Sequence, residues 1–141
     1  MTDPAEVALV DALARSAYVV MGVLSRVGAR HDLSLTQLRT LGILRDRRAR
    51  MTDLANFLGL DKSTMSGLVD RAERRGLLER GRSRADGRAV EVFMTAAGLE
   101  LADRLYGEVR QSLAEITDRL DPAQRDTLTR LLEHLLGPTP A

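Results

Sequence analysis

The stretch 51–76 constrains the fold of this chain more than any other. Apolar residues recur with helical spacing over Thr52–Leu58 and again over Lys62–Arg75, which predicts two helices. Gly59 falls between them, where the chain must leave the first helix with a positive φ that glycine tolerates best. Asp61 precedes the second helix, where its carboxylate can accept a free backbone N–H. The stretch therefore predicts two helices joined by a tight turn.

These two helices resemble the helix-turn-helix of DNA-binding proteins. A DNA major groove admits one α-helix, and a helix that reads it needs an exposed polar first turn above an apolar underside. The alternative is a solvated polar face on an ordinary surface helix, and the turn chemistry favours the first interpretation. The polar turn holds Lys62, Ser63, Thr64, Ser66 and Gly67; the underside holds Met65, Leu68 and Val69; and Arg71, Arg74 and Arg75 follow within reach of phosphates.

A hairpin is predicted after the two helices. Leu77–Arg80 and Val90–Met94 read as short strands, and the segment between them contains an Asp-Gly turn signal. A two-stranded hairpin is marginal alone, so we expect it to pack on the helices as a wing. The negative potential of a narrow minor groove attracts arginine, so we expect Arg88 there, its guanidinium held by Asp86 in a bidentate pair, with Arg84 nearby. The alternative is a solvated turn with an incidental ion pair.

Four further helices are expected around this unit. Their extents are 5–30, from Ser34 to the basic run Arg45–Arg50, from the cap Thr95 to about 119, and from Asp121-Pro122 to Gly137-Pro138, with a loose tail at 139–141. The basic run either complements a helix C-terminus or contacts phosphates. We therefore expect a mainly α fold with a small β-hairpin wing, comprising a winged helix-turn-helix DNA-binding domain at 33–94 and a helical dimerisation region at 1–32 and 95–141.

Composition and charge narrow the function. The 141 residues carry a net charge of +1, yet 39–94 hold 13 Lys/Arg against 8 Asp/Glu, a basic middle that suits DNA. Cysteine is absent and the two histidines lack ligand-spaced partners, so we expect no metal and no cofactor. No catalytic constellation stands out, so we expect no enzyme. No apolar run approaches the roughly 20 residues that span a bilayer, and the acidic N-terminus is unlike a signal peptide, so we expect a cytoplasmic protein.

The terminal helices carry leucine-rich stripes that need a partner. Exposed apolar patches of more than a few hundred Å² are rare in monomers. We therefore expect the first helix and the last two helices to pair two chains, and a two-fold dimer would bring two reading helices to successive major grooves of a pseudo-palindromic site. The alternative is that these helices pack only within their own chain.

Three segments together carry a family resemblance. The segments are LSLTQLRTLGIL, LANFLGLDKSTMSGLVDRAERRGLLER and RADGRAVEVFMTAAG, and with the order of elements they resemble the MarR family of winged-helix transcriptional regulators. The resemblance implies a triangular homodimer on double-stranded DNA. It also implies repression that is relieved by a small phenolic or aromatic acid.

The resemblance also implies roles for particular residues. It places Lys62, Ser63, Thr64, Ser66 and Arg71 on the DNA-facing helix, Asp86 and Arg88 at the wing tip, and Thr36 and Gln37 at the start of a helix that can touch phosphates. Gly67 departs from the family, whose members often have arginine or another polar residue there. The cysteine of the peroxide-sensing branch is also absent, which excludes thiol-based oxidant sensing.

An effector pocket is expected where the first helix, the helix after Ser34 and the helix after Thr95 meet. A cation beside an aromatic ring suits a carboxylate ligand. The candidate linings are Tyr18, Met21, Ser25, Arg30, His31 and Arg39, although Tyr18 and His31 fit ordinary packing equally well. Another function remains open at this point, namely a winged-helix module that binds proteins and touches DNA only incidentally.

Overall fold

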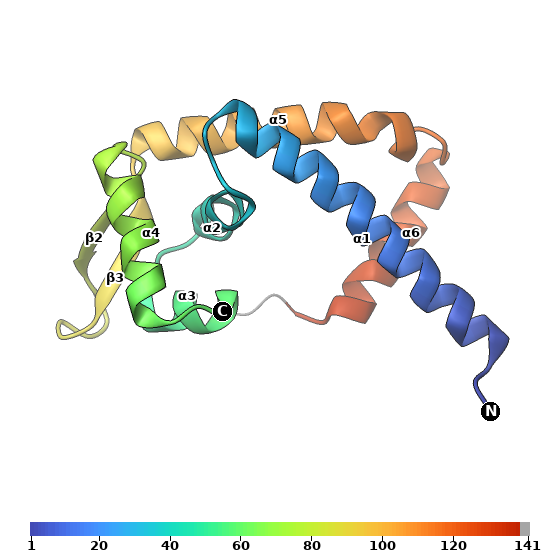
Figure 1. The fold of residues 1–141 in the computed structure, drawn as a ribbon, viewed down its shortest axis with the longest axis horizontal. Coiled ribbons are helices and arrows are strands. Elements are labelled where there is room, and N and C mark those ends of the chain that lie inside the picture. Colours follow the sequence, from blue (N-terminus) through green and yellow to red (C-terminus); the bar gives the residue numbers. More distant parts are fainter. Residues whose placement is uncertain (139–141) are drawn as a thin grey trace.

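A computed structural model describes residues 1–138, and the tail at 139–141 lies outside this range. The chain forms an arch in which one long helix spans the top and two legs descend from it (Figure 1). This mainly helical architecture with a small sheet confirms the expected fold class. The elements in order are α1 (Pro4–Arg30), α2 (Leu35–Leu44), β1 (Ala49–Arg50), α3 (Met51–Leu58), α4 (Lys62–Arg74), β2 (Leu78–Arg82), β3 (Val90–Met94), α5 (Ala96–Thr117) and α6 (Pro122–Leu136).

The helices begin and end within one or two residues of the positions that the sequence indicated. Ser34 and Gln37 form a reciprocal capping box at α2, and the Asp61 carboxylate accepts the Thr64 N–H at 2.7 Å at the start of α4. Hydrogen bonds from the Thr64 and Ser63 backbone N–H groups and the Thr64 hydroxyl lower the pKa of Asp61. Gly59 has φ 69°, the left-handed conformation that ends α3. Caps are local interactions, which is why a single sequence reveals them.

The sheet has three strands rather than the two that were expected. Strands β2 and β3 form the predicted antiparallel hairpin, and β1 pairs with the other edge of β3, so that Ala49 lies opposite Val92 and Arg50 opposite Glu91. Two residues inside an arginine run are too short to show strand alternation, so the sequence did not reveal β1. Because α3 starts at the residue after β1, this pairing ties the wing to the helix-turn-helix.

The hydrophobic core lies in the leg that carries the wing. Its side chains are aliphatic and come from α1, α2, α3, α4, the sheet and the first half of α5, and burial of a leucine-sized side chain is worth about 1.5–3 kcal/mol. Thr40 is also fully buried, and its hydroxyl donates to the Thr36 carbonyl at 2.8 Å. The most completely buried side chains are Val27, Thr40, Leu44, Leu54, Met65, Val69, Leu78 and Val92.

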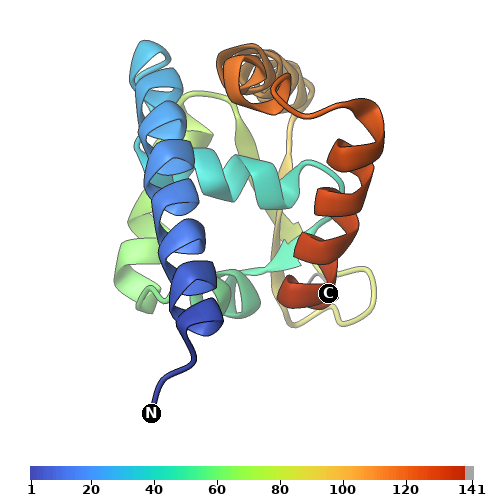
Figure 2. The same cartoon turned by 90° about the vertical axis from the view of Figure 1, so that its right-hand side faces the viewer.

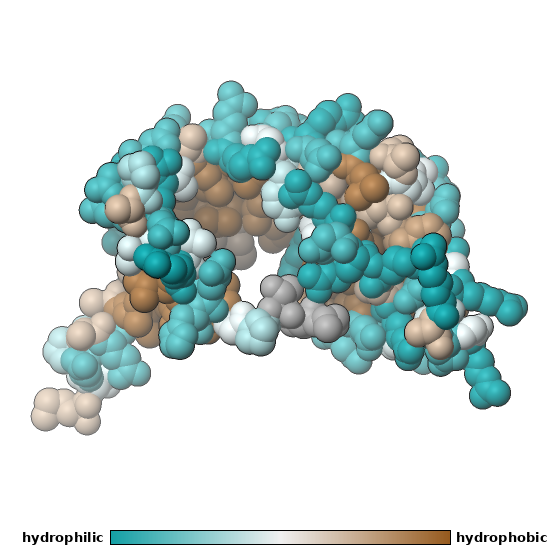
Figure 3. Space-filling view, turned by 180° about the vertical axis from the view of Figure 1, so that it is seen from behind, coloured by the Kyte–Doolittle hydropathy of each residue, from teal (hydrophilic) through white to brown (hydrophobic). Residues whose placement is uncertain are grey.

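The other leg has almost no buried surface of its own. Helix α6 contains no buried residue, and in α1 burial is confined to Val23, Val27 and Gly28 near its C-terminus. Figure 2 shows α1 and α6 on opposite sides of a gap beneath α5, and Figure 3 shows hydrophobic side chains gathered on this half of the molecule. The exposed apolar side chains include Leu9, Val10, Leu13 and Val20 of α1 and Leu128, Leu131, Leu132, Leu135 and Leu136 of α6.

Helix α1 corrects one expectation about apolar runs. It contains an 18-residue window with a mean hydropathy of 1.7 and at most two charged residues, which is long and apolar enough to cross a membrane by length and composition alone. Asp11 and Arg15 interrupt the uncharged run, but two charges are too few to lower the mean hydropathy of the window. An apolar helix that its own chain leaves uncovered suits either lipid or another protein surface.

Candidate nucleic-acid interface

Helix α4 presents the predicted polar turn to solvent. Met65, Leu68, Val69 and Ala72 are buried beneath the helix, where they fix its angle against the core. The opposite side carries the cations and short polar groups that were predicted to face DNA. Lys62, Ser63, Thr64, Arg71 and Arg74 are all exposed there, whereas Ser66 and Gly67 are only partly exposed.

Arg80 on β2 holds the flank of α4, a role that the sequence did not reveal. Its guanidinium donates to the Asp70 carboxylate at 2.8 Å and to the Glu73 carboxylate. It also donates to the Ser66 carbonyl at 3.3 Å and to the Ser66 hydroxyl at 3.2 Å. Burial alone would lower the pKa of Arg80, but its hydrogen bonds to Asp70 and Glu73 raise it above the ordinary value.

This cluster changes the electrostatics of the reading face. Two carboxylates on α4 would repel phosphates, and the Arg80 guanidinium compensates their charge within hydrogen-bond distance. The Ser66 hydroxyl, which was predicted to contact DNA, accepts a bond from Arg80 and so lies toward β2. The arrangement favours a positioning role for Ser66 and leaves the outward face to the exposed side chains Lys62, Ser63, Thr64, Arg71 and Arg74.

The tip of the wing is built around Ser83. This side chain is only 5% exposed, and its hydroxyl accepts the backbone N–H groups of Ala85 and Asp86, each at 3.2 Å. The Asp86 carboxylate in turn accepts the backbone N–H of Arg88 at 3.1 Å. Within residues 1–138 it forms no pair with the Arg88 guanidinium, so the predicted bidentate pair is wrong. Asp86 shapes the turn instead, because its carboxylate is taken up by a backbone group two residues away.

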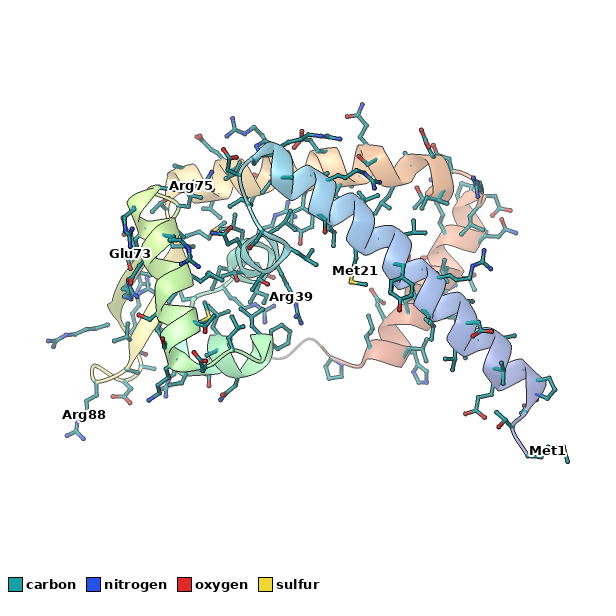
Figure 4. The ribbon with its side chains drawn as sticks, in the orientation of Figure 1. Met1, Met21, Arg39, Glu73, Arg75 and Arg88 are labelled. Atoms are coloured by element: carbon teal, nitrogen blue, oxygen red, sulfur yellow. The ribbon has the colours of Figure 1, made fainter. Side chains whose placement is uncertain are left out.

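The wing arginines are free to meet a ligand. Arg84 and Arg88 are exposed, and Figure 4 shows Arg88 pointing away from the body at the far end of the hairpin. The tip lies on the same leg as α4, so the wing and the reading helix can contact one surface together.

The start of α2 is less available than expected. Thr36 and Gln37 are partly buried. The Gln37 side-chain oxygen accepts the Ser34 N–H at 2.7 Å, and the side chain borders a small cleft with Leu68 and Ala72 on the buried side of α4. This placement favours a structural role for Gln37 over a phosphate contact.

The basic run after α2 begins at the helix C-terminus with Arg45, and the side chains of Arg45 and Arg48 have partners that neither interpretation named. Arg45 lies over the Tyr106 ring, 4.4 Å from its centroid, and donates to Asp103 at 3.0 Å. Arg48 lies 3.9 Å from the centroid of the Phe93 ring and donates to Glu91 at 3.2 Å. Arg45 therefore joins the end of α2 to α5, and Arg48 joins the segment before β1 to β3. Sequence spacing could not indicate these aromatic contacts, because each partner lies on another element.

A cavity of about 910 Å³ lies beneath the arch, between α1, α2, β1, α3 and α5. Met21 and Arg39 line it as predicted, and Figure 4 shows both side chains directed into the space under α5. The Arg39 guanidinium lies 5.1 Å from the centroid of the Phe57 ring, which also lines the cavity together with Tyr106. A guanidinium beside aromatic rings in a largely apolar hollow suits a ligand with an aromatic body and an acidic group.

The other residues that were predicted to line the pocket lie outside this cavity, so the prediction is wrong for them. Tyr18 is 73% exposed and lies outside the lining, one helical turn before Met21, where the cavity wall on α1 begins. Arg30 and His31 lie at the end of α1, where the His31 ring nitrogen is 2.5 Å from a Glu108 carboxylate oxygen and Arg30 is 3.7 Å from the other. Ser25 is exposed and does not line the cavity either.

Comparisons with known proteins agree with this geometry. A family model described as "MarR family" matches residues 31–89. An uncharacterised HTH-type transcriptional regulator, YfiV of Bacillus subtilis, is 28% identical over 98 residues, which are 69% of this chain and 61% of that protein. The homoprotocatechuate degradative operon repressor of Escherichia coli is 25% identical over 130 residues, which are 92% of this chain and 88% of that protein.

The fold is also shared with solved structures. CouR from Rhodococcus jostii, bound to p-coumaroyl-CoA, superposes with a TM-score of 0.74 at 23% identity, and the match covers 92% of each chain. At this identity the likeness establishes the fold. It includes both legs of the arch, so the splayed terminal helices are part of a known architecture.

Proposed function

The chain belongs to the MarR family of transcriptional regulators, and from this premise we propose that it is a sequence-specific repressor that binds double-stranded DNA as a homodimer. The observation that carries the proposal is the outward face of α4. Short polar side chains and two arginines lie over a fully buried apolar underside, beside a wing with exposed arginines. That combination suits a helix lying in a major groove with an arginine in the adjacent minor groove.

The proposed DNA contacts follow from exposure. Bases in the major groove would meet Ser63 and Thr64, since these lie in the first turn of α4. Lys62 and Arg71 would contact phosphates, and Arg88 would enter the minor groove with Arg84 beside it. The proposed DNA-binding domain is 33–94, which contains the whole of this surface.

The proposed dimerisation region comprises 1–32 and 95–141. Its support is the set of leucines that α6 leaves exposed, together with the uncovered apolar side of α1. A second copy would bury both, and ten leucine-sized side chains at about 1.5–3 kcal/mol each are enough for a stable dimer. Because a DNA-binding role requires access to the chromosome, we propose that the protein is cytoplasmic and that α1 pairs with protein rather than lipid.

The proposed effector is a small aromatic or phenolic acid, with no metal or other cofactor. The cavity supports this, since Arg39 can bind a carboxylate while Phe57 and Tyr106 contact a ring. It lies between the α4 leg and α1, so a ligand there would act on the angle between the reading helix and the dimer. The p-coumaroyl-CoA bound by CouR carries a phenolic acyl group of related chemistry.

Selection from a random duplex library tests the proposal. The protein is expected to enrich an inverted repeat whose half-sites lie about one helical turn, roughly 34 Å, apart. Binding to that site should weaken steeply with salt, because each neutralised phosphate adds about −0.9 to the log–log slope. Weak binding with no enriched sequence would contradict the proposal and favour a winged-helix module that binds proteins.

A further inference from the structure

The end of α4 is tied to the turn that follows α1, and one arginine makes the tie. Arg75 is the residue that ends α4, and its two terminal nitrogens donate to successive carbonyls, to Asp32 at 3.0 Å and to His31 at 2.9 Å. Among the described residues these are the hydrogen bonds that join α4 to α1 and its turn. The guanidinium is therefore bound to this turn at the protein surface, although its position in the sequence had suggested a phosphate contact.

The turn that accepts these bonds is rigidly built. Leu33 N–H donates back to the Gly28 carbonyl at 2.9 Å, and a Cβ on Gly28 would lie 2.7 Å from the Leu33 carbonyl oxygen. Asp32 has φ 56°, a left-handed conformation that is unusual for a residue other than glycine. The carbonyls at such a helix end lack helical partners, and a cation there is favoured by the helix dipole.

The same turn is held to α5 from its other side. The His31 ring contacts Glu108 of α5, and Arg30 lies beside the same carboxylate. The residues 31–32 thus connect three helices: α4, which would read DNA, and α1 and α5, which would form the dimer. Figure 4 shows Arg75 at the end of α4 nearest to α5, at the opposite end of the leg from Arg88.

We propose that Arg75 is a positioning residue that fixes the angle of the reading helix relative to the dimer, and so sets which half-site spacing the protein accepts. This inference rests on the proposed function as a dimeric DNA-binding protein. The two reading helices of a dimer are held apart through the joints between each reading leg and the dimerisation helices, and this turn is one of those joints. A joint with two hydrogen bonds to one rigid turn restricts rotation more than a single contact would.

The first test needs neither DNA nor a dimer. The chain has no cysteine, so Ser63→Cys on α4 and Arg104→Cys on α5 allow two spin labels to be placed at exposed sites, and pulsed electron resonance then measures the distance between them. The labelled chain is mixed with an excess of unlabelled chain, so that a homodimer carries at most one labelled copy, and with Arg75 present one narrow distance distribution is expected. Arg75→Met is expected to lose that single narrow maximum. Arg74→Met, on the same helix and with an exposed side chain, is the matched control and is expected to keep it.

The second test uses DNA. On duplexes whose half-site spacing is changed one base pair at a time, Arg75→Met is expected to reduce discrimination against wrong spacings about 5-fold or more, within the usual range for coupled sites. Its salt slope at the best spacing should equal that of the wild type. Arg74→Met should show the reverse, with lower affinity at every spacing and a shallower slope, since it would lose a phosphate contact.

Two results would overturn the inference. One is an unchanged distance distribution in Arg75→Met. The other is a uniform loss of affinity with a shallower salt slope, which would make Arg75 a phosphate contact. If the methionine variant does not fold, Arg75→Gln is measured with the same criteria. If the wild type itself selects no duplex, the proposed function fails, while the distance measurement still decides whether Arg75 fixes the helix.

Discussion

The two legs of the arch differ in how many of their apolar side chains are buried, and how many of their charged ones are paired, within the single chain. The leg with α2, α3, α4 and the sheet buries an aliphatic core, caps its helices and pairs its carboxylates. The leg with α1 and α6 leaves its leucines in solvent, and α6 buries none of its residues. The first leg has a core within the single chain, to which the end of α1 and the first half of α5 contribute, whereas the second acquires a core only when another surface covers it.

This difference explains why DNA reading and dimer formation would depend on each other. A rigid reading unit needs a fixed partner at one helical turn's distance, and the uncovered leg is the surface that could supply it. Changes to the two legs should therefore fail differently. Those in the apolar leg should abolish pairing with little local unfolding, and those in the reading leg should act on DNA contact or on folding.

The largest effect is expected from a charge on the uncovered face. Leu135→Asp replaces a leucine that is 54% exposed in the single chain and that a second copy would bury. Loss of one such burial from each copy, at about 1.5–3 kcal/mol apiece, should weaken the dimer at least about 100-fold. Sedimentation velocity measures this change. His134→Asp, the neighbouring position on the polar side of α6, is the control and should remain dimeric.

The next largest effect is expected at the wing. Arg88→Ala removes an exposed guanidinium that would lie in the minor groove and should weaken binding to the selected duplex about 10- to 100-fold. Its circular dichroism and melting temperature should not change, because the Arg88 contact that shapes the turn is a backbone N–H. Fluorescence anisotropy with Arg104→Ala as the control measures the loss. Equal affinities for the two variants would contradict the assignment.

A smaller loss is expected when Arg80 is removed. Arg80→Ala leaves two carboxylates of α4 uncompensated beside the reading face and should reduce DNA affinity about 10-fold, since hydrogen bonds to charged groups contribute about 1.5–3 kcal/mol. Adding Asp70→Asn removes one of those charges and should restore part of the affinity. A double variant no better than Arg80→Ala would show that charge compensation is not the reason for the loss.

Two glycines of α5 test how closely this helix, which spans the top of the arch, packs on the rest of the chain. A Cβ at Gly98 would lie 2.1 Å from the Leu77 carbonyl oxygen, so Gly98→Ala should destabilise the fold by about 1–3 kcal/mol. A Cβ at Gly107 meets nothing within 4 Å, so Gly107→Ala should stabilise α5 by about 0.5–1 kcal/mol. Urea denaturation of both variants measures the free energy of unfolding, which should fall for Gly98→Ala and rise for Gly107→Ala. Equal effects would contradict the close approach of α5 to Leu77.

The smallest effect is expected from the cap of α4. The pKa of Asp61 is lowered in the folded chain, so its contribution to stability is present above the unfolded pKa, near 4, and is lost as the pH falls through the folded value. Asp61→Asn keeps a capping oxygen and should remove this acid-dependent part of the stability while changing neutral-pH stability little. Melting curves between about pH 2 and pH 7 measure the difference. A wild-type chain and an Asn variant that lose stability in parallel would contradict it.

Most of the fold could be predicted from the sequence alone, because its signals are local. Caps such as Ser34 and Asp61 act within one turn of chain, so spacing reveals them. Arg80 could not be found that way, because its partners lie on another element and its neighbours in sequence say nothing of them. Tyr18 was misplaced for a related reason, since how far a cavity extends along an apolar helix depends on how the legs splay.

The number of chains bound to one DNA site tests most directly whether the protein reads DNA as a dimer. We predict that the native mass of the complex with the selected inverted repeat corresponds to two copies per duplex, and that the free protein is already a dimer at the same concentration. A free protein with the mass of one chain, bound to that duplex as a single copy with undiminished affinity, would contradict the view that the uncovered leg exists to pair two reading units.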